Sequence, residues 1–383
     1  MSRSLRIAML SHSINPRGGV VHAMQLSEAL TALGHEVVLH APDAKGIGFF
    51  RKPACGAVCI PVEPAPTDMT AMVEQRIDEY IKHFESPTAH AFDIFHAHDG
   101  ISGNALATLK ERGLIPAFAR TIHHIDQFSD PRLMELQDRS IDRADLFFTV
   151  SALWQKTLKE TRSIASTIVG NGVDTNRFSP AVNAADLKRK LGLPQGPVFL
   201  AVGGIEARKN TLAVLEAFRQ IRAIRPDAQF VIAGGASLLD HRGYQGEFRT
   251  ALASLGEHAA AVHILGTIAD GDMPALYRLA DTLVFASIKE GFGLVVLEAM
   301  ASGIPAVVSS IAPFTEYLSA DDAVWCDPTH PASIAEAMAI SLMPPIRQRL
   351  IQRGPEVAAV HSWQRTAAAH LSAYETLKEP AHA

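Results

Sequence analysis

Two glutamates bracket a glycine-rich turn and are the residues of this sequence best placed to do chemistry. Glu290 precedes the run Gly291-Phe292-Gly293, and Glu298 follows in the early turns of a predicted helix. The glycines allow backbone N–H groups to approach a ligand closely, and the start of a helix favours an anion. Carboxylates accept hydrogen bonds from hydroxyls, as they do from ribose at dinucleotide sites. The turn therefore offers a phosphate cradle between two hydroxyl-binding carboxylates, which suits a nucleoside diphosphate sugar.

The elements around this turn predict a strand–helix–strand unit. An apolar run from Thr282 to Ala286 precedes the turn, and a second apolar run covers Ala306–Val308. Between them lies an amphipathic helix that ends near Gly303 and Pro305. This order is typical of a βαβ unit in a parallel sheet. The alternative is an ordinary buried βαβ unit that carries two solvated glutamates.

The same alternation of short apolar runs and helical patterns continues over the whole chain and favours a doubly wound α/β architecture. The predicted strands of the first half are Leu5–Leu10, Val37–His40, Asp93–His96, Ala117–Ile122, Leu146–Val150 and Thr167–Val169. Those of the second half are Val198–Val202, Phe230–Ala233, Val262–Leu265, Leu283–Ala286 and Ala306–Val308. Residues 41–70 are rich in Pro and Gly and predict a long irregular loop. Turn signals between 171 and about 195 predict a hinge between two domains.

Size and composition exclude several classes of protein. The 383 residues suffice for two domains, and 48% hydrophobic with 20% charged residues is typical of globular proteins with large cores. A net charge of −5 argues against general nucleic-acid binding, which needs a basic surface. No apolar run reaches the roughly 18 residues of a membrane span, and the first apolar run is too short for a signal peptide. Peripheral membrane contact stays an alternative, although no run of clustered Lys and Arg supports it.

The three cysteines, Cys55, Cys59 and Cys326, form no disulfide framework, and no Cys/His pair completes a zinc site with them. They predict free thiols in a reducing cytoplasm.

The Glu-x7-Glu spacing within EGFGL and LEAMASGIP resembles the signature of the large retaining glycosyltransferase family of the GT-B fold, family 4 type. The resemblance extends over nearly the whole chain. It implies two Rossmann-like, doubly wound domains that face a cleft, with a last helix that crosses back to the N-terminal domain. Residues 1–178 with the returning helix 362–378 would bind the acceptor. Residues 179–361 would bind the nucleotide-sugar donor.

A loop of the second half matches this family in part. VGGIEARKN (Val202–Asn210) follows a predicted strand and precedes a helix. The resemblance implies an Arg directly after the first glycine and a Lys five positions later, both on the diphosphate. Lys209 keeps the Lys, but Gly204 stands where the Arg is expected. Arg208 is the natural substitute, and the alternative is a solvated Arg–Lys pair.

The resemblance also implies how the donor would be held. Glu298 would bind the ribose, Glu290 would hold hydroxyls of the transferred sugar, and the backbone near Ile268 would read the nucleobase. The glycine-rich loops would contact the diphosphate through backbone groups. The residues of these loops are Gly18, Gly19, Gly291, Phe292, Gly293 and Leu294.

Histidines end two predicted strands of the first half, where the carboxyl ends of open α/β sheets face the ligand crevice. The family has a T-x-H strand end that faces the donor sugar, and His123 after Thr121 matches it. His96, His98 and Asp126 are further candidates on the sugar or acceptor side. His12 and His22 fit a structural or acceptor-side role. A metal site would need three or four converging ligands, which spacing cannot show, and no metal is expected.

Taken with the resemblance, the sequence predicts a retaining glycosyltransferase. It would move a hexose-type sugar from a nucleoside diphosphate to an unknown hydroxyl acceptor, without cofactor or metal. The catalytic roles would fall to His123, Glu290, Lys209 and Arg208. One alternative is a non-catalytic nucleotide-sugar-binding protein. Another is an NAD-dependent dehydrogenase with Asp43 on the ribose, which would lack the third glycine of the dinucleotide fingerprint.

Overall fold

The computed structural model describes residues 3–89, 91–235 and 241–377. The chain divides into two compact units, and each is described by itself. The first unit comprises Met1–Asn171 and Trp363–Ala383, and the second comprises Gly172–Ser362. The sequence analysis placed the first boundary after residue 178, seven positions downstream of the division after Asn171.

The first unit is built on a seven-stranded sheet of order β3-β2-β1-β4-β5-β6-β7, in which neighbouring strands pair in parallel. Its strands are β1 (Arg6–Leu10), β2 (Glu36–Asp43), β3 (Gly56–Pro61), β4 (Ile94–Ala97), β5 (Ala119–Ile122), β6 (Leu146–Thr149) and β7 (Thr167–Ile168). Helices cover both faces of the sheet, so its central strands are buried and mostly apolar, and Ile7 to Leu10 are fully buried. The strand order reverses between β1 and β4, the place where open sheets bind ligands.

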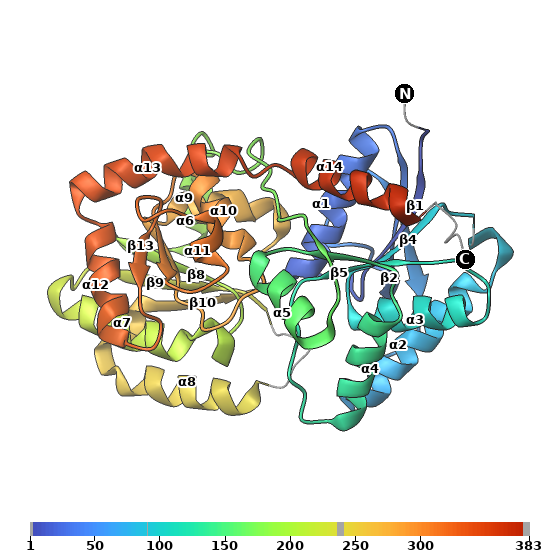
Figure 1. Ribbon diagram of the computed structural model, residues 1–383. Coiled ribbons are helices and arrows are strands. Elements are labelled where there is room, and N and C mark those ends of the chain that lie inside the picture. The colour runs from blue at the N-terminus through green and yellow to red at the C-terminus, as the bar shows by residue number, and fades with distance from the viewer. Residues whose placement is uncertain (1–2, 90, 236–240, 378–383) are drawn as a thin grey trace. The chain divides into compact units, whose positions relative to one another are not determined.

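The helices of the first unit include one from the far end of the chain. They are α1 (Gly18–Ala32), α2 (Met69–Phe84), α3 (Gly100–Glu111), α4 (Pro131–Asp142), α5 (Ala152–Arg162), α14 (Trp363–Tyr374) and the short 3₁₀ helices η1 (Pro87–Ala89) and η5 (Glu375–Leu377). Helix α14 packs on α1, and Figure 1 shows the red helix beside the blue one. Its buried face carries Trp363, Thr366, Ala367, His370 and Tyr374.

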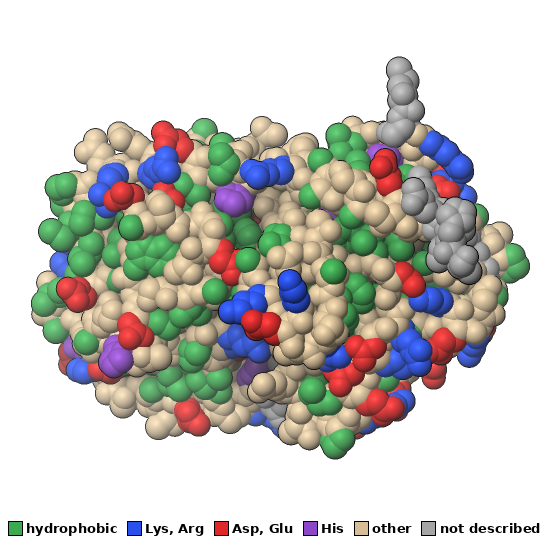
Figure 2. Space-filling view, viewed as in Figure 1, with side chains coloured by type: hydrophobic (Ala, Val, Ile, Leu, Met, Phe, Trp, Pro, Cys, Tyr) green, Lys and Arg blue, Asp and Glu red, His purple; other side chains and the backbone are tan. Residues whose placement is uncertain are grey.

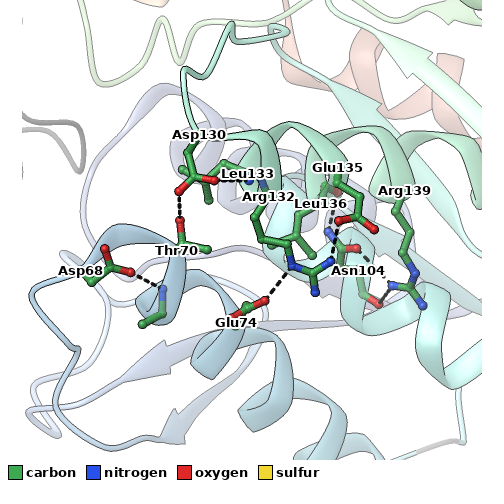
Figure 3. A network of polar contacts seen from close by, with 11 residues as sticks. Asp68, Thr70, Glu74, Asn104, Asp130, Arg132, Leu133, Glu135, Leu136 and Arg139 are labelled. Carbon is green, nitrogen blue, oxygen red and sulfur yellow. Dashed lines mark hydrogen bonds and ion pairs between the residues drawn. The ribbon is translucent and has the colours of Figure 1, made fainter.

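Polar side chains join α2, α3 and α4 on the outside of the first unit (Figure 3). The Thr70 hydroxyl donates to Asp130 at 2.6 Å, and Arg132 pairs with Glu74 at 2.8 Å. Asp130 also caps α4 by accepting from the backbone N–H of Arg132 at 2.7 Å. Because α4 follows β5 through the loop 123–130, this network fixes the far end of a loop that carries predicted site residues.

The second unit repeats the plan with a six-stranded parallel sheet of order β10-β9-β8-β11-β12-β13. Its strands are β8 (Val198–Val202), β9 (Gln229–Ala233), β10 (Val262–Gly266), β11 (Thr282–Phe285), β12 (Ala306–Ser309) and β13 (Val324–Cys326). The order reverses between β8 and β11, so the loops that follow these two strands frame its ligand edge. The predicted doubly wound α/β class is confirmed in both units.

Helices cover the sheet of the second unit on both faces. They are α6 (Ala185–Leu191), α7 (Thr211–Ile224), α8 (Arg242–Ser254), α9 (Met273–Leu279), α10 (Leu294–Ala301), α11 (Phe314–Tyr317), α12 (Pro331–Ser341) and α13 (Pro344–Ala359). The 3₁₀ helices are η2 (Ala207–Lys209), η3 (Gly256–Ala261) and η4 (Asp270–Asp272). On the face drawn in Figure 2, Lys and Arg side chains lie beside Asp and Glu side chains. Among the described residues, no helix has the length and apolarity that crossing a bilayer requires.

The prediction of one long irregular loop over residues 41–70 was wrong. Strand β2 continues to Asp43, β3 occupies Gly56–Pro61, and α2 starts at Met69. Strand β3 lies at the edge of the sheet, where a glycine at one end and a proline at the other are tolerated. The Gly and Pro residues that predicted a loop therefore flank a short edge strand.

Candidate functional site

The glycine-rich turn of the second unit lies at the predicted ligand edge, between the end of β11 and the start of α10. Gly293 has φ +94°, which favours glycine, and it immediately precedes α10. A Cβ at this position would lie 2.6 Å from the Phe314 ring. The backbone N–H groups of Phe292, Gly293 and Leu294 therefore begin a helix from a turn that no larger residue could form.

Glu290 forms a buried ion-pair cluster with the loop that follows β8. Its Oε1 lies 2.6 Å from Lys209 Nζ and 3.0 Å from Arg208 Nη1, and the residue is 8% exposed. Burial alone would raise the pKa of Glu290, but the charges of Lys209 and Arg208 outweigh burial and lower it. Burial lowers the pKa of Lys209, and the attraction of Glu290 opposes this shift. The structure thus brings three predicted site residues together, with the carboxylate ionised.

The environment of Gly204 explains why no Arg stands there. A Cβ would lie 2.7 Å from the carbonyl oxygen of Gly235 and 3.0 Å from Oε1 of Glu206. Glu206 is 5% exposed, and its carboxylate lies 3.2 Å from Nε of Arg208. Arg208 is therefore held between two carboxylates, and its side chain stays 47% exposed. Sequence reasoning missed Glu206, although a charge in the middle of a predicted phosphate loop was a usable signal.

Glu298 belongs to a second polar group, on α10. Its Oε2 accepts a hydrogen bond from the Tyr277 hydroxyl at 2.5 Å. Burial raises the pKa of Glu298, while the Tyr277 bond and Arg177 act in the opposite direction. Arg177 in turn pairs with Asp270 at 2.7 Å, just before α9. Sequence reasoning did not name Tyr277 or Arg177, because neither the α9 pattern nor the turn near Asn171 marks them as partners of a glutamate.

The remaining donor-side predictions lie at the same edge of the second sheet. Ile268 follows β10 and is half-buried, and the hydroxyl of the adjacent Thr267 lies where a Cβ on Gly235 would be. Gly291 and Leu294 are half-buried on either side of the turn. The loops after β8, β9, β10 and β11 thus all contribute to one edge.

In the first unit, the predicted Gly-Gly turn begins α1, and His123 lies against it. Helix α1 starts at Gly18, and a Cβ on Gly19 would lie 3.3 Å from the His123 ring. A Cβ on Gly18 would meet no other atom within 4 Å. Gly19 is therefore small because an imidazole covers it, and Gly18 leaves the helix start accessible.

His98 supports His123 from the neighbouring strand end. Nδ1 of His98 and Nε2 of His123 are hydrogen-bonded at 3.2 Å, and the rings stack with centroids 5.4 Å apart. Nε2 of His98 contacts Sδ of Met9 at 2.8 Å. His98 is 4% exposed, and burial lowers its pKa well below the ordinary value. Both ring nitrogens of His98 therefore have partners, and His98 serves to hold the His123 ring in place.

His96 lies deeper in the first unit than its predicted place on the sugar side. It is fully buried, with Nδ1 at 2.6 Å from the Tyr374 hydroxyl and Nε2 at 2.8 Å from Thr121 Oγ1. Both ring nitrogens are therefore used to join α14 to β5. The sequence around His96 could not show this, because Tyr374 comes from the last helix.

Buried imidazoles continue from His123 to the last helix. His22 lies 4.8 Å from His123 and 5.9 Å from His370 between ring centroids, and its Nδ1 bonds Asn171 Oδ1 at 2.6 Å. Burial lowers the pKa of His22 to about 4 and that of His370 to about 3. These neutral rings form part of the core of the first unit. Among the described residues, no three His, Cys, Asp or Glu side chains gather in a way that could hold a metal ion.

Two carboxylates at the edge of the first sheet are fixed by their own loops. Asp126 exchanges two backbone hydrogen bonds with the Gln137 amide, at 2.9 and 2.8 Å, and its carboxylate pairs with His124 at 3.0 Å. Asp43 is 5% exposed and accepts from the backbone N–H groups of Lys45 and Gly48 at 3.1 and 2.8 Å. The dehydrogenase alternative needs Asp43 for a ribose, but this carboxylate already caps its own loop.

Comparisons with known proteins identify the family of this chain. Residues 183–357 match the family described as Glycosyl transferases group 1, and residues 16–177 match Glycosyltransferase Family 4. D-inositol 3-phosphate glycosyltransferase of Salinispora arenicola is 30% identical over 318 residues, which are 76% of this chain and 70% of that protein. Phosphatidyl-myo-inositol mannosyltransferase of Mycobacterium leprae is 25% identical and covers 97% of each chain.

Solved structures share the fold. Sucrose-phosphate synthase from Thermosynechococcus elongatus superposes with a TM-score of 0.79 at 21% identity, covering 98% of this chain and 99% of that chain. Anabaena HepE in complex with UDP and glucose gives a TM-score of 0.78 at 17% identity, covering 98% and 100%. The predicted GT-B architecture is therefore confirmed. The two family matches, the relative from Salinispora and the shared fold lead to one conclusion: this chain belongs to the glycosyl transferases group 1 and is a transferase.

Proposed function

We propose that this protein is a retaining hexosyltransferase that uses a nucleoside diphosphate hexose and an acceptor hydroxyl. The observation that carries the proposal is the cluster of Lys209 and Arg208 on Glu290, beside the glycine-rich turn that begins α10. Cations, a helix start and a hydroxyl-binding carboxylate stand together at the point where the second sheet reverses its strand order. This is the chemistry that a diphosphate joined to a sugar requires.

The second unit would bind the donor. Lys209, Arg208 and the backbone N–H groups of the turn would stabilise the charge that grows on the diphosphate as its bond to the sugar C1 breaks. Glu290 would accept hydrogen bonds from sugar hydroxyls through the lone pairs that the cations leave free. Glu298, oriented by Tyr277, would accept from the ribose. The base would lie along the loop near Ile268.

The first unit would contribute His123 and the start of α1. If Nε2 of His123 is committed to His98, its Nδ1 is the nitrogen left to meet a sugar hydroxyl. Asp126, held by Gln137, is the carboxylate proposed for the acceptor side. His96, whose nitrogens are both used within the unit, would act only by supporting β5 and α14.

We propose that retention does not involve a covalent intermediate on Glu290. A carboxylate that forms a glycosyl-enzyme must attack C1 as a nucleophile. Lys209 and Arg208 share Oε1 of Glu290, and their charges lower its pKa, which makes this carboxylate a weaker nucleophile. We therefore assign Glu290 to hydroxyl binding and propose direct transfer on the face that the diphosphate leaves.

No metal or cofactor enters the proposal, because two side-chain cations and a helix start supply the charge that a divalent ion would otherwise bring. The nucleobase stays open, since HepE is solved in complex with UDP and the catalytic domain of starch synthase IV from Arabidopsis thaliana is bound to ADP. The described cysteines are free thiols, which fits the proposed cytoplasmic location.

The test is a binding and turnover screen against UDP-, GDP- and ADP-hexoses, with and without EDTA. We expect one donor to raise the melting temperature without metal and to be hydrolysed slowly. Proton NMR of the first sugar released should show the anomer of the donor. Release of the opposite anomer would contradict retention. Binding with no hydrolysis and no transfer to any hydroxyl acceptor would favour the non-catalytic alternative.

A further inference from the structure

We propose that Tyr317 is a positioning residue of the diphosphate site. It would hold the peptide between Phe292 and Gly293 so that the Gly293 N–H faces the diphosphate. This inference rests on the proposed function, since it concerns the same turn. It adds a residue that carries no charge, lies outside the Glu-x7-Glu motif and follows Glu298 by 19 positions.

Two rings hold the turn from one side. Phe292 and Tyr317 stack with centroids 4.5 Å apart and planes 5° from parallel. Phe292 is 7% exposed, although it sits in a turn between two glycines. His361 approaches the Tyr317 ring edge-on, with centroids 5.5 Å apart. The Phe292 side chain is thus anchored in the core of the second unit, and this packing also restrains the backbone of the turn.

A hydrogen bond fixes the direction of the peptide as well as its place. The Tyr317 hydroxyl donates to the carbonyl oxygen of Phe292 at 3.2 Å. In a trans peptide the carbonyl and the following N–H point to opposite sides. The carbonyl of Phe292 therefore faces Tyr317, and the N–H of Gly293 is turned away from it. Rotation of this peptide would break the bond and redirect the N–H.

The same short helix restrains the turn at the next residue. Phe314 and Tyr317 are the first and last residues of α11. The Phe314 ring lies 2.6 Å from the position of a Cβ on Gly293 and meets Phe285 of β11 at 5.8 Å. Phe314 therefore limits Gly293 to a residue without a side chain, and Tyr317 limits the peptide to one orientation. Burial raises the pKa of Tyr317 well above its ordinary value, so the hydroxyl keeps the proton that it donates.

The experiment compares Tyr317→Phe with wild type by calorimetry, using the nucleoside diphosphate that binds best and the matching nucleoside. The variant keeps the ring stack and loses only the hydroxyl. We expect the affinity for the diphosphate to fall by about 3- to 10-fold, as for one neutral hydrogen bond. The affinity for the nucleoside should not change, because the nucleoside has no phosphate to meet Gly293. Tyr317→Leu, which also removes the stack, should lower diphosphate affinity further.

Tyr80→Phe is the matched control. The Tyr80 hydroxyl also donates to backbone carbonyls, those of Ser11 and His40, but it lies in the first unit. This variant should bind both ligands as wild type does. Hydrogen exchange gives a second measurement: amides 291–296 should exchange faster in Tyr317→Phe than in wild type.

Equal losses for nucleoside and diphosphate would overturn the inference, because they would indicate a general structural effect. Unchanged affinities with unchanged exchange would also overturn it. In both cases the proposed function would stand, since wild type still binds the diphosphate. A wild-type protein that binds no nucleoside diphosphate would overturn the function and the inference together.

Discussion

The ammonium nitrogen of Lys209 lies 2.6 Å from Oε1 of Glu290, and the two side chains are almost completely shielded from water. The same nitrogen sits 4.3 Å from the centre of the Phe285 ring. A charge held between a carboxylate and an aromatic face is fixed in place before any ligand arrives. Such preorganisation is what stabilisation of a departing diphosphate needs.

Replacement of each cation separates their roles. Lys209→Ala should destabilise the protein by roughly 3–5 kcal/mol, because it breaks a buried pair, and should also lower turnover. Arg208 is half exposed, so Arg208→Ala should leave stability nearly unchanged. We expect its loss of turnover to be at least as large as that of Lys209→Ala. Thermal unfolding and donor hydrolysis measure the two effects.

Arg349→Ala, on the surface of the same unit, is the control. An Arg208→Ala enzyme with turnover within twofold of wild type would show that Arg208 is only a surface residue.

Restoring the family's Arg at position 204 should fail. From the sequence alone, Gly204→Arg combined with Arg208→Ala would recover part of the lost turnover if the backbone tolerated a side chain. The structure places the Gly235 carbonyl 2.7 Å from the new Cβ, so we expect a lower melting temperature and no recovery. Recovery of turnover at an unchanged melting temperature would contradict the account given for Gly204.

The two glutamates should respond differently to neutralisation. Glu298→Gln should weaken the binding of free nucleoside diphosphate by roughly 1.5–3 kcal/mol, as for a hydrogen bond to a charged group. Tyr277→Phe should reproduce part of this loss, because it frees Glu298 from its orienting hydroxyl. Glu290→Gln should leave nucleotide affinity nearly intact and lower turnover. Calorimetry on the three variants checks the pattern, and the reverse pattern would exchange the roles.

His123→Ala should bind nucleoside diphosphates as wild type does, since the nucleotide is assigned to the other unit. Donor hydrolysis or transfer should fall by about tenfold or more, as expected for a lost positioned group. Calorimetry and initial rates provide the comparison. Full activity in this variant would make His123 a core residue like His96.

The first unit should lose stability on acidification. Its buried histidines have depressed pKa values, about 4 for His22 and about 3 for His370, against 6.5 for a free side chain. Below pH 6.5 these histidines bind protons in the unfolded chain but not in the folded unit. Their contribution to the free energy of unfolding is therefore complete above pH 6.5 and falls as the pH decreases towards 4. Each such histidine contributes at most about 1.4 kcal/mol per pH unit.

Denaturant unfolding of the first unit at several pH values measures this slope. His370→Leu should reduce the slope by about one proton. His330→Gln, at an exposed position of the second unit, should leave it unchanged. A flat profile between pH 6.5 and 4 would show that these imidazoles are not held neutral.

The sequence predicted the elements whose pattern is local and missed contacts that depend on topology. Runs such as Val198–Val202 are apolar because both faces of a parallel sheet are buried, so periodicity finds them. Strand β3, by contrast, is a short edge strand between proline and glycine signals, and these signals predicted a loop.

The same distinction holds for the site. The spacing of Glu290 and Glu298 alone identifies their motif. Lys209, which contacts Glu290 in the structure, was found through the family resemblance. Tyr277 and Tyr317 act through partners that only the folded backbone brings near, so no spacing rule names them. Glu206 pairs with Arg208 only two positions away, and its charge within the loop was a signal that the sequence analysis did not use. For His96 the sequence identified the strand end but not the hydroxyl of Tyr374, which lies 278 positions away and uses one of its nitrogens.

Helix α14 has a consequence for the order in which the protein can be made. The second unit is one uninterrupted segment, whereas the first unit needs Trp363, His370 and Tyr374 to fill its core. On a ribosome, the first half of the chain emerges long before these residues do. It must wait with an incomplete core while the segment that follows it can already fold. The part of the protein synthesised first is therefore the part completed last.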